Sequence, residues 1–150
     1  MAAVAIALAT SANAQLSKGR SEYEFTRISG NSMLPTLTSG DVAVVYKAYP
    51  YRKLRVGDVV IVESERGFSV IHRIVRRYRG GMWVTQGDNN RREDREVLTE
   101  DNFKGLALVD DSMARYKKHV ASIGGSEEGI QKVAFANTQN TSRLHNTKNS

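Results

Sequence analysis

The sequence contains no cysteine in its 150 residues. This absence excludes disulfide bonds, thiolate nucleophiles and cysteine-based zinc sites, and it is compatible with either an oxidising or a reducing compartment. Any covalent catalysis must therefore use a hydroxyl group. The sequence predicts no cofactor and no metal ligand.

The first 15 residues lack charged side chains altogether and are rich in alanine. Residues 2–14 would span only about 20 Å as a helix, whereas a bilayer core needs about 20 apolar residues. The triplet Ala12-Asn13-Ala14 fits the small-x-small rule for a signal-peptide cleavage site, although no basic residue precedes the apolar stretch. Three interpretations stay open: a cleaved export signal, the remnant of a membrane anchor, or a disordered alanine-rich tail.

The overall composition is ordinary for a globular protein, with 40% hydrophobic and 25% charged residues. A chain of this length can bury one real core, so we expect one folded domain. The formal net charge of +6 would suit nucleic acid or an anionic membrane surface. Charge alone therefore discriminates little between partners.

Residues 23–109 carry the pattern of a β protein. Runs rich in β-branched residues alternate with turns that contain Gly-Asp or Gly-Gly. The strands predicted from these runs lie at 42–46, 56–62, 69–78, 82–86 and 106–109. Gly80 and Gly81 form a predicted hairpin turn, and residues 98–103 a short helical turn before the last strand. The predicted fold class is all-β, a curled and mostly antiparallel sheet.

The C-terminal part of the chain changes character. Residues 112–123 predict one helix, because Met113, Tyr116 and Val120 recur at spacings of three and four before a Gly-Gly pair. Residues 137–150 contain a single large apolar side chain, so we expect that segment to be disordered.

One serine stands in a turn directly ahead of the first strong strand. Ser32 lies in the string Gly-Asn-Ser-Met-Leu-Pro-Thr-Leu, where Gly30 permits an unusual backbone angle and Pro35 stiffens the chain. A serine hydroxyl attacks an amide only if a base takes its proton and donors stabilise the oxyanion. Ser32 is therefore the candidate nucleophile; the alternative is that Ser32 and Thr36 are merely turn residues.

A candidate base follows forty residues later. His72 shares one face of the predicted strand with Val70 and Ile74, while the other two histidines lie in the C-terminal tail. No lysine occurs between residues 53 and 104, and the guanidinium of Arg73 stays protonated. Histidine is thus the predicted base, against the simpler interpretation of a structural strand histidine.

Two carboxylates come after the next strand, in the string Gly-Asp-Asn-Asn-Arg-Arg-Glu-Asp-Arg. A carboxylate that accepts a hydrogen bond from the far ring nitrogen of His72 would fix its tautomer and stabilise the imidazolium. Spacing alone leaves both Asp88 and Asp94 open. A purely structural alternative for Asp88 is an Asx-type turn that caps its own loop.

Taken together, these three strings resemble type I signal peptidases of the subgroup that uses histidine, typical of endoplasmic reticulum and archaeal enzymes. The resemblance implies a β fold of the kind shared with self-cleaving repressors and a serine endopeptidase that cuts signal peptides after small residues. Its Asp-Arg pair matches Asp94 and Arg95, so it makes Asp94 the third catalytic residue and leaves Asp88 to shape the loop or assist.

The same resemblance organises the rest of the chain. It implies an apolar export or anchor segment with a linker at 1–26, a catalytic β domain at 27–109, and a helix with a polar tail at 110–150. The expected partners are signal peptides of exported preproteins and a membrane surface, without nucleic acid. The expected location is membrane-associated, with the catalytic domain extracytoplasmic.

Oxyanion donors and substrate contacts complete the predicted site. Many relatives carry a serine two residues before the nucleophile, where this chain has glycine. We therefore assign the oxyanion hole to the backbone N–H of Ser32, with Asn31 or Ser29 as a second donor. Met33, Leu34 and Val45 are the predicted substrate contacts.

Two other classes of function compete with the peptidase. One is a non-catalytic β module of the same fold that acts as a secretion partner. The other is a basic nucleic-acid-binding domain that uses residues 76–79 and 91–92, although a run of charge is usually a solvated face. A self-cleaving repressor is disfavoured, because it would pair a similar serine turn with lysine and carry a DNA-binding domain.

Overall fold

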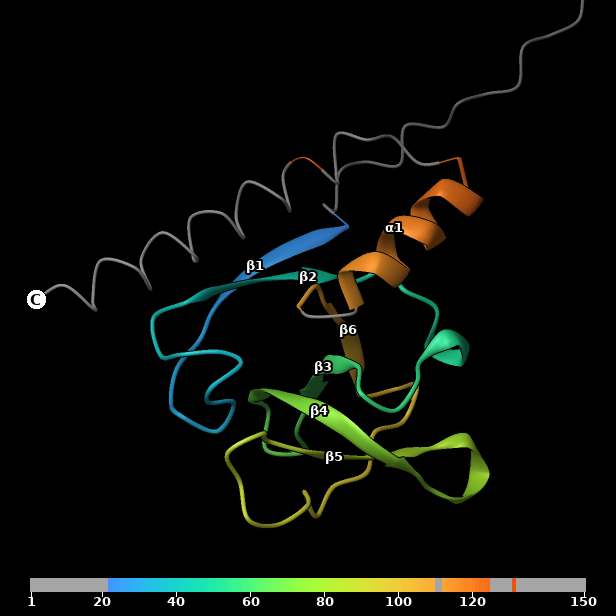
Figure 1. Cartoon of the computed structure of the whole chain (residues 1–150). Coiled ribbons are helices and arrows are strands. Elements are labelled where there is room, and N and C mark those ends of the chain that lie inside the picture. The colour runs from blue at the N-terminus through green and yellow to red at the C-terminus, as the bar shows by residue number, and fades with distance from the viewer. Residues whose placement is uncertain (1–21, 110–111, 125–130, 132–150) are drawn as a thin grey trace, which may run out of the picture.

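The computed structural model describes residues 22–109, 112–124 and 131, and one antiparallel sheet organises them (Figure 1). Six strands hydrogen-bond in the order β1-β2-β6-β3-β4-β5, and the sheet stays open. Their bounds are β1 Tyr23–Arg27, β2 Val42–Tyr46, β3 Val59–Glu63, β4 Ser69–Arg77, β5 Trp83–Gln86 and β6 Phe103–Ala107. Two short 3-10 turns, η1 (Tyr51–Lys53) and η2 (Arg79–Gly81), connect them. The predicted all-β class is confirmed.

The short helical turn predicted for residues 98–103 is confined to residues 99–103. Leu98 is extended, because its N–H and C=O bond to the backbone of Trp83 at 2.8 and 3.0 Å. A single helical turn follows, closed by the bond from the N–H of Phe103 to the carbonyl of Thr99 at 3.1 Å, and the Asn102 side chain accepts from the N–H of Thr99 at 2.8 Å. The last strand therefore starts at Phe103, three residues earlier than its predicted start at 106.

The predicted helix forms as α1 (Ser112–Ser122) and packs beside the strands β2 and β6 (Figure 1). Tyr116 and Val120 are buried in the main core cluster. The Tyr116 ring lies 5.2 Å from that of Tyr46 and 6.0 Å from that of Tyr23, measured between centroids. The helix and the sheet therefore share one apolar core, and the core includes β1, which begins inside the segment 1–26.

A buried ion pair also ties α1 to the sheet. Asp58, which precedes β3, has no exposed surface, and its carboxylate pairs with the guanidinium of Arg115. The backbone N–H of Arg55 donates to the same carboxylate at 2.8 Å. A buried carboxylate is tolerated when charge and hydrogen bonds compensate it. This pair fixes the position of α1 against the loop that carries η1.

The expectations for residues 1–14 and 137–150 lie outside the described residues. Within the described ranges, none of the helices has the length and apolar character needed to cross a bilayer.

Candidate active site

The serine turn is part of the loop between β1 and β2. Its two ends meet where the N–H of Ile28 donates to Asp41 at 2.8 Å and the N–H of Gly40 donates back to Ile28 at 2.9 Å. Met33 and Leu37 point into a second apolar cluster, which anchors the turn from inside. Ser32 sits one residue before that anchor and stays partly exposed.

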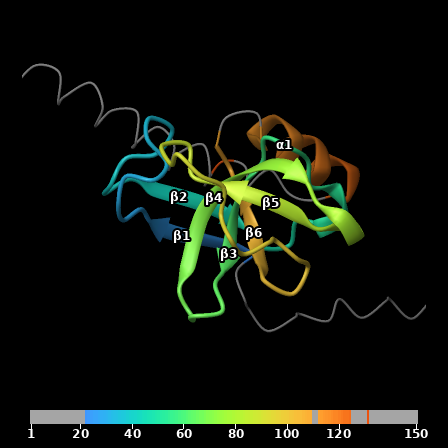
Figure 2. The same ribbon diagram turned by 90° about the horizontal axis from the view of Figure 1, so that it is seen from below.

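The turn docks against the loop that follows β5, as both ribbon views show (Figures 1 and 2). The backbone N–H of Asn89 donates to the carbonyl of Ser32 at 2.8 Å. The Asn89 side chain donates to the carbonyl of Asn31 at 3.1 Å. These bonds fix the backbone of the candidate nucleophile to the far end of the sheet.

His72 and Asp94 form a hydrogen-bonded pair. The Nδ1 atom of His72 lies 2.7 Å from Oδ2 of Asp94. The same carboxylate oxygen accepts from the hydroxyl of Thr85 at 2.7 Å, and the backbone N–H of Asp94 donates to the carbonyl of Thr85 at 2.9 Å. Asp94 is thus held at both its side chain and its backbone, facing one nitrogen of the imidazole.

This contact decides the tautomer of the histidine. A carboxylate only accepts, so Nδ1 of His72 carries a hydrogen and Nε2 of the neutral ring keeps its lone pair. Nε2 has no hydrogen-bond partner among the described residues. Every fully buried side-chain nitrogen or oxygen of those residues has a partner, so Nε2 is not fully buried. Nε2 therefore retains contact with solvent and can accept a proton.

Strand register places the serine turn beside this pair. In the β4–β5 ladder, Arg73, which follows His72, is opposite Gln86, which precedes Gly87. Gly87 in turn lies against the carbonyl of Ser32. Within the described part of the chain no hydrogen bond links the Ser32 hydroxyl to the imidazole, and bonds of this kind often tighten only with substrate in place.

Asp88 has a different role from Asp94. Its carboxylate takes two hydrogen bonds from the Arg73 guanidinium, at 2.8 Å from Nε and 2.7 Å from Nη2. The hydroxyl of Thr36, in the serine loop, donates to it at 2.5 Å. We call these three residues the Arg73–Asp88–Thr36 clamp, which joins the serine loop to β4 and the loop after β5. Asp88 therefore shapes the loop rather than orienting the imidazole.

The clamp gives the protein a defined response to acid. Hydrogen bonds from Arg73, with a smaller one from Thr36, lower the pKa of Asp88 below the ordinary 3.8, against the raising effect of burial. The stabilisation is therefore complete above about pH 5 and is lost as the pH falls through the lowered pKa. We expect Asp88→Asn to reduce the free energy of unfolding at neutral pH and to differ little from the wild type at the acid extreme.

Urea unfolding at a series of pH values measures this effect. Glu93→Gln is the matched control, since Glu93 pairs with Arg76 on the exposed surface, where solvent screens the two charges. Equal pH profiles for Asp88→Asn and the wild type would contradict the clamp.

The oxyanion donors are partly defined. The backbone N–H of Ser32 donates to no acceptor among the described residues, so it is available to an oxyanion. Ser29 and Asn31 are exposed on the same loop. The structure gives neither side chain a hydrogen bond within the described ranges, so the assignment of a second donor to Asn31 or Ser29 stays a prediction.

The three predicted substrate contacts differ in their exposure to solvent. Met33 and Val45 are each 1% exposed, so packing accounts for their presence. Leu34 alone is partly exposed. A cavity of about 270 Å³ opens instead beside the His72–Asp94 pair, with Phe68 and Val70 in its apolar lining. We therefore assign Met33 and Val45 to the core.

Gly87 leaves no room for a side chain beneath the serine turn. A Cβ at this position would stand 2.6 Å from the backbone oxygen of Ser32 and 2.7 Å from the side chain of Asn90. We expect Gly87→Ala to displace the turn and to lower the free energy of unfolding by about 1–3 kcal/mol. The turnover of the protein that remains folded should also fall, because the serine has moved. Gly67→Ala is the control for backbone strain without a side-chain clash, because Gly67 has a positive φ but open space around it.

Steady-state kinetics and thermal melts on both variants check this expectation. A Gly87→Ala protein with wild-type turnover would show that the turn need not touch the end of β5.

Sequence reasoning missed Thr85, and it gave Arg73 no role. Thr85 was detectable as a polar residue directly after the apolar pair Trp83-Val84, because a buried hydroxyl needs a partner. The role of Arg73 carried no such signal, since its partners lie 15 and 37 residues away in the chain.

The chain matches the Peptidase S24-like family over residues 5–110 and belongs to that family. The family includes signal peptidase I and self-cleaving repressors, so membership indicates a peptidase-like or self-cleaving fold. No curated protein and no solved structure matches the chain.

Proposed function

We propose that this protein is a serine endopeptidase that removes signal peptides by cutting after small residues. Ser32 is the nucleophile, His72 the general base and Asp94 the group that orients the imidazole. The observation that carries the proposal is the 2.7 Å contact between His72 Nδ1 and Asp94 Oδ2, which leaves Nε2 of the imidazole as its proton acceptor. Cleavage of a synthetic signal peptide by the wild type and by Ser32→Ala tests it.

The geometry supports a two-stage acyl transfer. The Ser32 oxygen attacks the scissile carbonyl carbon while its proton passes to Nε2 of His72. The backbone N–H of Ser32 donates to the oxyanion that forms. His72 then protonates the leaving amine, which breaks the C–N bond and leaves an ester on Ser32. Water, deprotonated by the same nitrogen, hydrolyses that ester, and Asp94 stabilises the imidazolium in both stages.

The described lysines support histidine rather than lysine as the base. No lysine lines the cavity beside His72 and Asp94. Lys104 pairs with Glu63, and Lys53 lies 3.1 Å from the imidazole of His119, packed against α1. This distribution favours a signal peptidase of the histidine type over a self-cleaving repressor with a lysine base.

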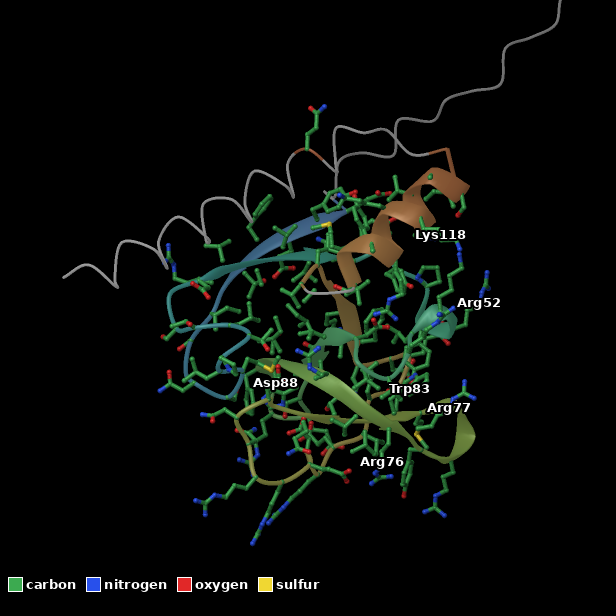
Figure 3. The ribbon with its side chains drawn as sticks, viewed as in Figure 1. Arg52, Arg76, Arg77, Trp83, Asp88 and Lys118 are labelled. Carbon is green, nitrogen blue, oxygen red and sulfur yellow. The ribbon has the colours of Figure 1, made fainter. Side chains whose placement is uncertain are left out.

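Two of the arginines on which the nucleic-acid alternative rests have partners within the protein. Nε and Nη2 of Arg76 donate hydrogen bonds to the carboxylate of Glu93 at 2.8 and 2.7 Å. Arg77 lies over the ring of Trp83, 5.0 Å from its centroid (Figure 3). Strong salt-dependent binding to an oligonucleotide, without peptide cleavage, would favour that alternative.

We further propose that the protein works at the outer face of a membrane on signal peptides of exported preproteins. Such substrates emerge at a bilayer surface, and residues 1–14 are long enough to direct export or to enter the interface. We expect the full chain in the membrane or extracytoplasmic fraction. Fractionation of the full chain and of a version that starts at residue 15, with mass spectrometry of the mature N-terminus, distinguishes an anchor from cleavage after Ala14. Intact full-length chain confined to the cytosol would contradict this location.

A further inference from the structure

A second cavity, of about 510 Å³, lies between η1 and α1, away from the candidate catalytic residues. Its lining is dominated by cations. We call it the basic cavity and define it by the six basic residues Arg52, Lys53, Arg55, Arg115, Lys118 and His119. Figure 3 shows Arg52 and Lys118 directed toward the same space from the two elements. No acidic residue lines this cavity.

Most of this charge is uncompensated. Of the five lysines and arginines in the basic cavity, Arg115 is the one that pairs with a carboxylate of the described chain, that of Asp58. Arg52, Arg55 and Lys118 are exposed and form no ion pair with a described residue. Cations held together repel one another, so an anion placed among them would be stabilised by all of them.

The inner wall of the basic cavity is organised rather than loosely solvated. Lys53 donates to Nδ1 of His119 at 3.1 Å, so the neutral ring carries its hydrogen on Nε2. Burial, and then the charge of Lys53, lower the pKa of His119. Tyr49 packs its ring against this imidazole at 5.4 Å, and Leu54 is buried beside it. The cavity therefore combines cationic donors with an apolar floor.

We propose that the basic cavity binds a phosphate group carried on a small organic moiety. Guanidinium groups match the paired oxygens of a phosphate, and lysine adds point charge. The volume lies within the range of about 300–1,000 Å³ typical of ligand sites, which exceeds the need of a bare anion. The phosphate could belong to a soluble ester or to a phospholipid headgroup, and its binding does not depend on the peptidase activity.

The test uses the full chain and two charge-reversed variants. Arg52→Glu/Lys118→Glu alters the basic cavity at two exposed and unpaired positions. Arg79→Glu/Arg92→Glu makes the same change in net charge at exposed positions elsewhere. Binding of glycerol 3-phosphate is measured by calorimetry. Binding to vesicles of phosphatidylcholine, with and without phosphatidylglycerol, is measured by sedimentation.

We expect the cavity variant to weaken binding by about tenfold or more and the control variant by less than about threefold. Saturable binding of glycerol 3-phosphate with this pattern identifies a soluble ester as the source. Binding to the phosphatidylglycerol vesicles alone, with the same pattern, identifies a lipid headgroup. Arg52→Gln/Lys118→Gln repeats the measurement if the charge-reversed protein has a lowered melting temperature.

Three outcomes would overturn the proposal. One is equal weakening by the cavity and control variants, which would mark general surface charge. Another is no binding to either probe. The third is binding to an oligonucleotide alone. None of them depends on turnover, so a catalytically inactive protein would still decide the question.

Discussion

Ser32→Ala is expected to lower the turnover of a signal-peptide substrate by about four to six orders of magnitude. The nucleophilic oxygen is lost, and what remains is binding and stabilisation of the oxyanion. The Ser32 hydroxyl makes no hydrogen bond to a described residue, so its removal leaves no buried group unsatisfied. The melting temperature should therefore stay within about 1–2 °C of the wild type.

His72→Ala should cost a similar amount, and the double variant should be no worse than either single one, because the two residues act as a unit. Ser39→Ala, at an exposed serine of the same loop, and His119→Ala, on α1, are the matched controls. Kinetics on all five proteins, with melting curves for each, complete the test. Additive losses in the double variant, or a Ser39→Ala protein as damaged as Ser32→Ala, would contradict the assignment.

Asp94→Asn is expected to lower turnover by about 10⁴-fold with a folded protein. The amide can donate to Nδ1 of His72, which would hold the hydrogen on Nε2 and remove the acceptor that the nucleophile needs. Thr85 contacts the same carboxylate oxygen as His72, so its hydroxyl would then accept a hydrogen bond from the amide nitrogen instead of donating one. The variant therefore separates orientation of the imidazole from the structural role of the carboxylate.

Asp88→Asn provides the comparison at the other predicted carboxylate. It should cost about 1–3 kcal/mol of stability, because two charged hydrogen bonds to Arg73 weaken, and should change turnover far less. Matched kinetics and thermal melts on both variants measure the two effects. A large catalytic loss at Asp88 with a silent Asp94 would reverse the roles of the two carboxylates.

The strands and the helix could be predicted because their signals are local. β2 has the bounds read from its β-branched run, and α1 ends one residue before its predicted end. The turn predicted at 98–103 begins one residue later than predicted, because Leu98 pairs with Trp83 and the local pattern does not encode that pairing. Tertiary pairing decided that segment.

The candidate site divides in the same way. Ser32, His72 and Asp94 were chosen from strings in the sequence, and the His72–Asp94 contact is a property of the folded chain. The clamp could not be predicted, because Asp88 meets Thr36 across 52 residues. Met33 and Val45 were predicted to contact the substrate. An apolar side chain near a turn can equally face the core, and both of these side chains are buried there.

The most direct test of the proposed signal peptidase activity is the mass of the products from a preprotein incubated with the full chain. We expect one cut, after a small residue at the end of the signal peptide. The cut should be absent with Ser32→Ala and blocked when that small residue is replaced by a large one. No cleavage by the wild type, or an identical cut by Ser32→Ala, would contradict the proposed activity.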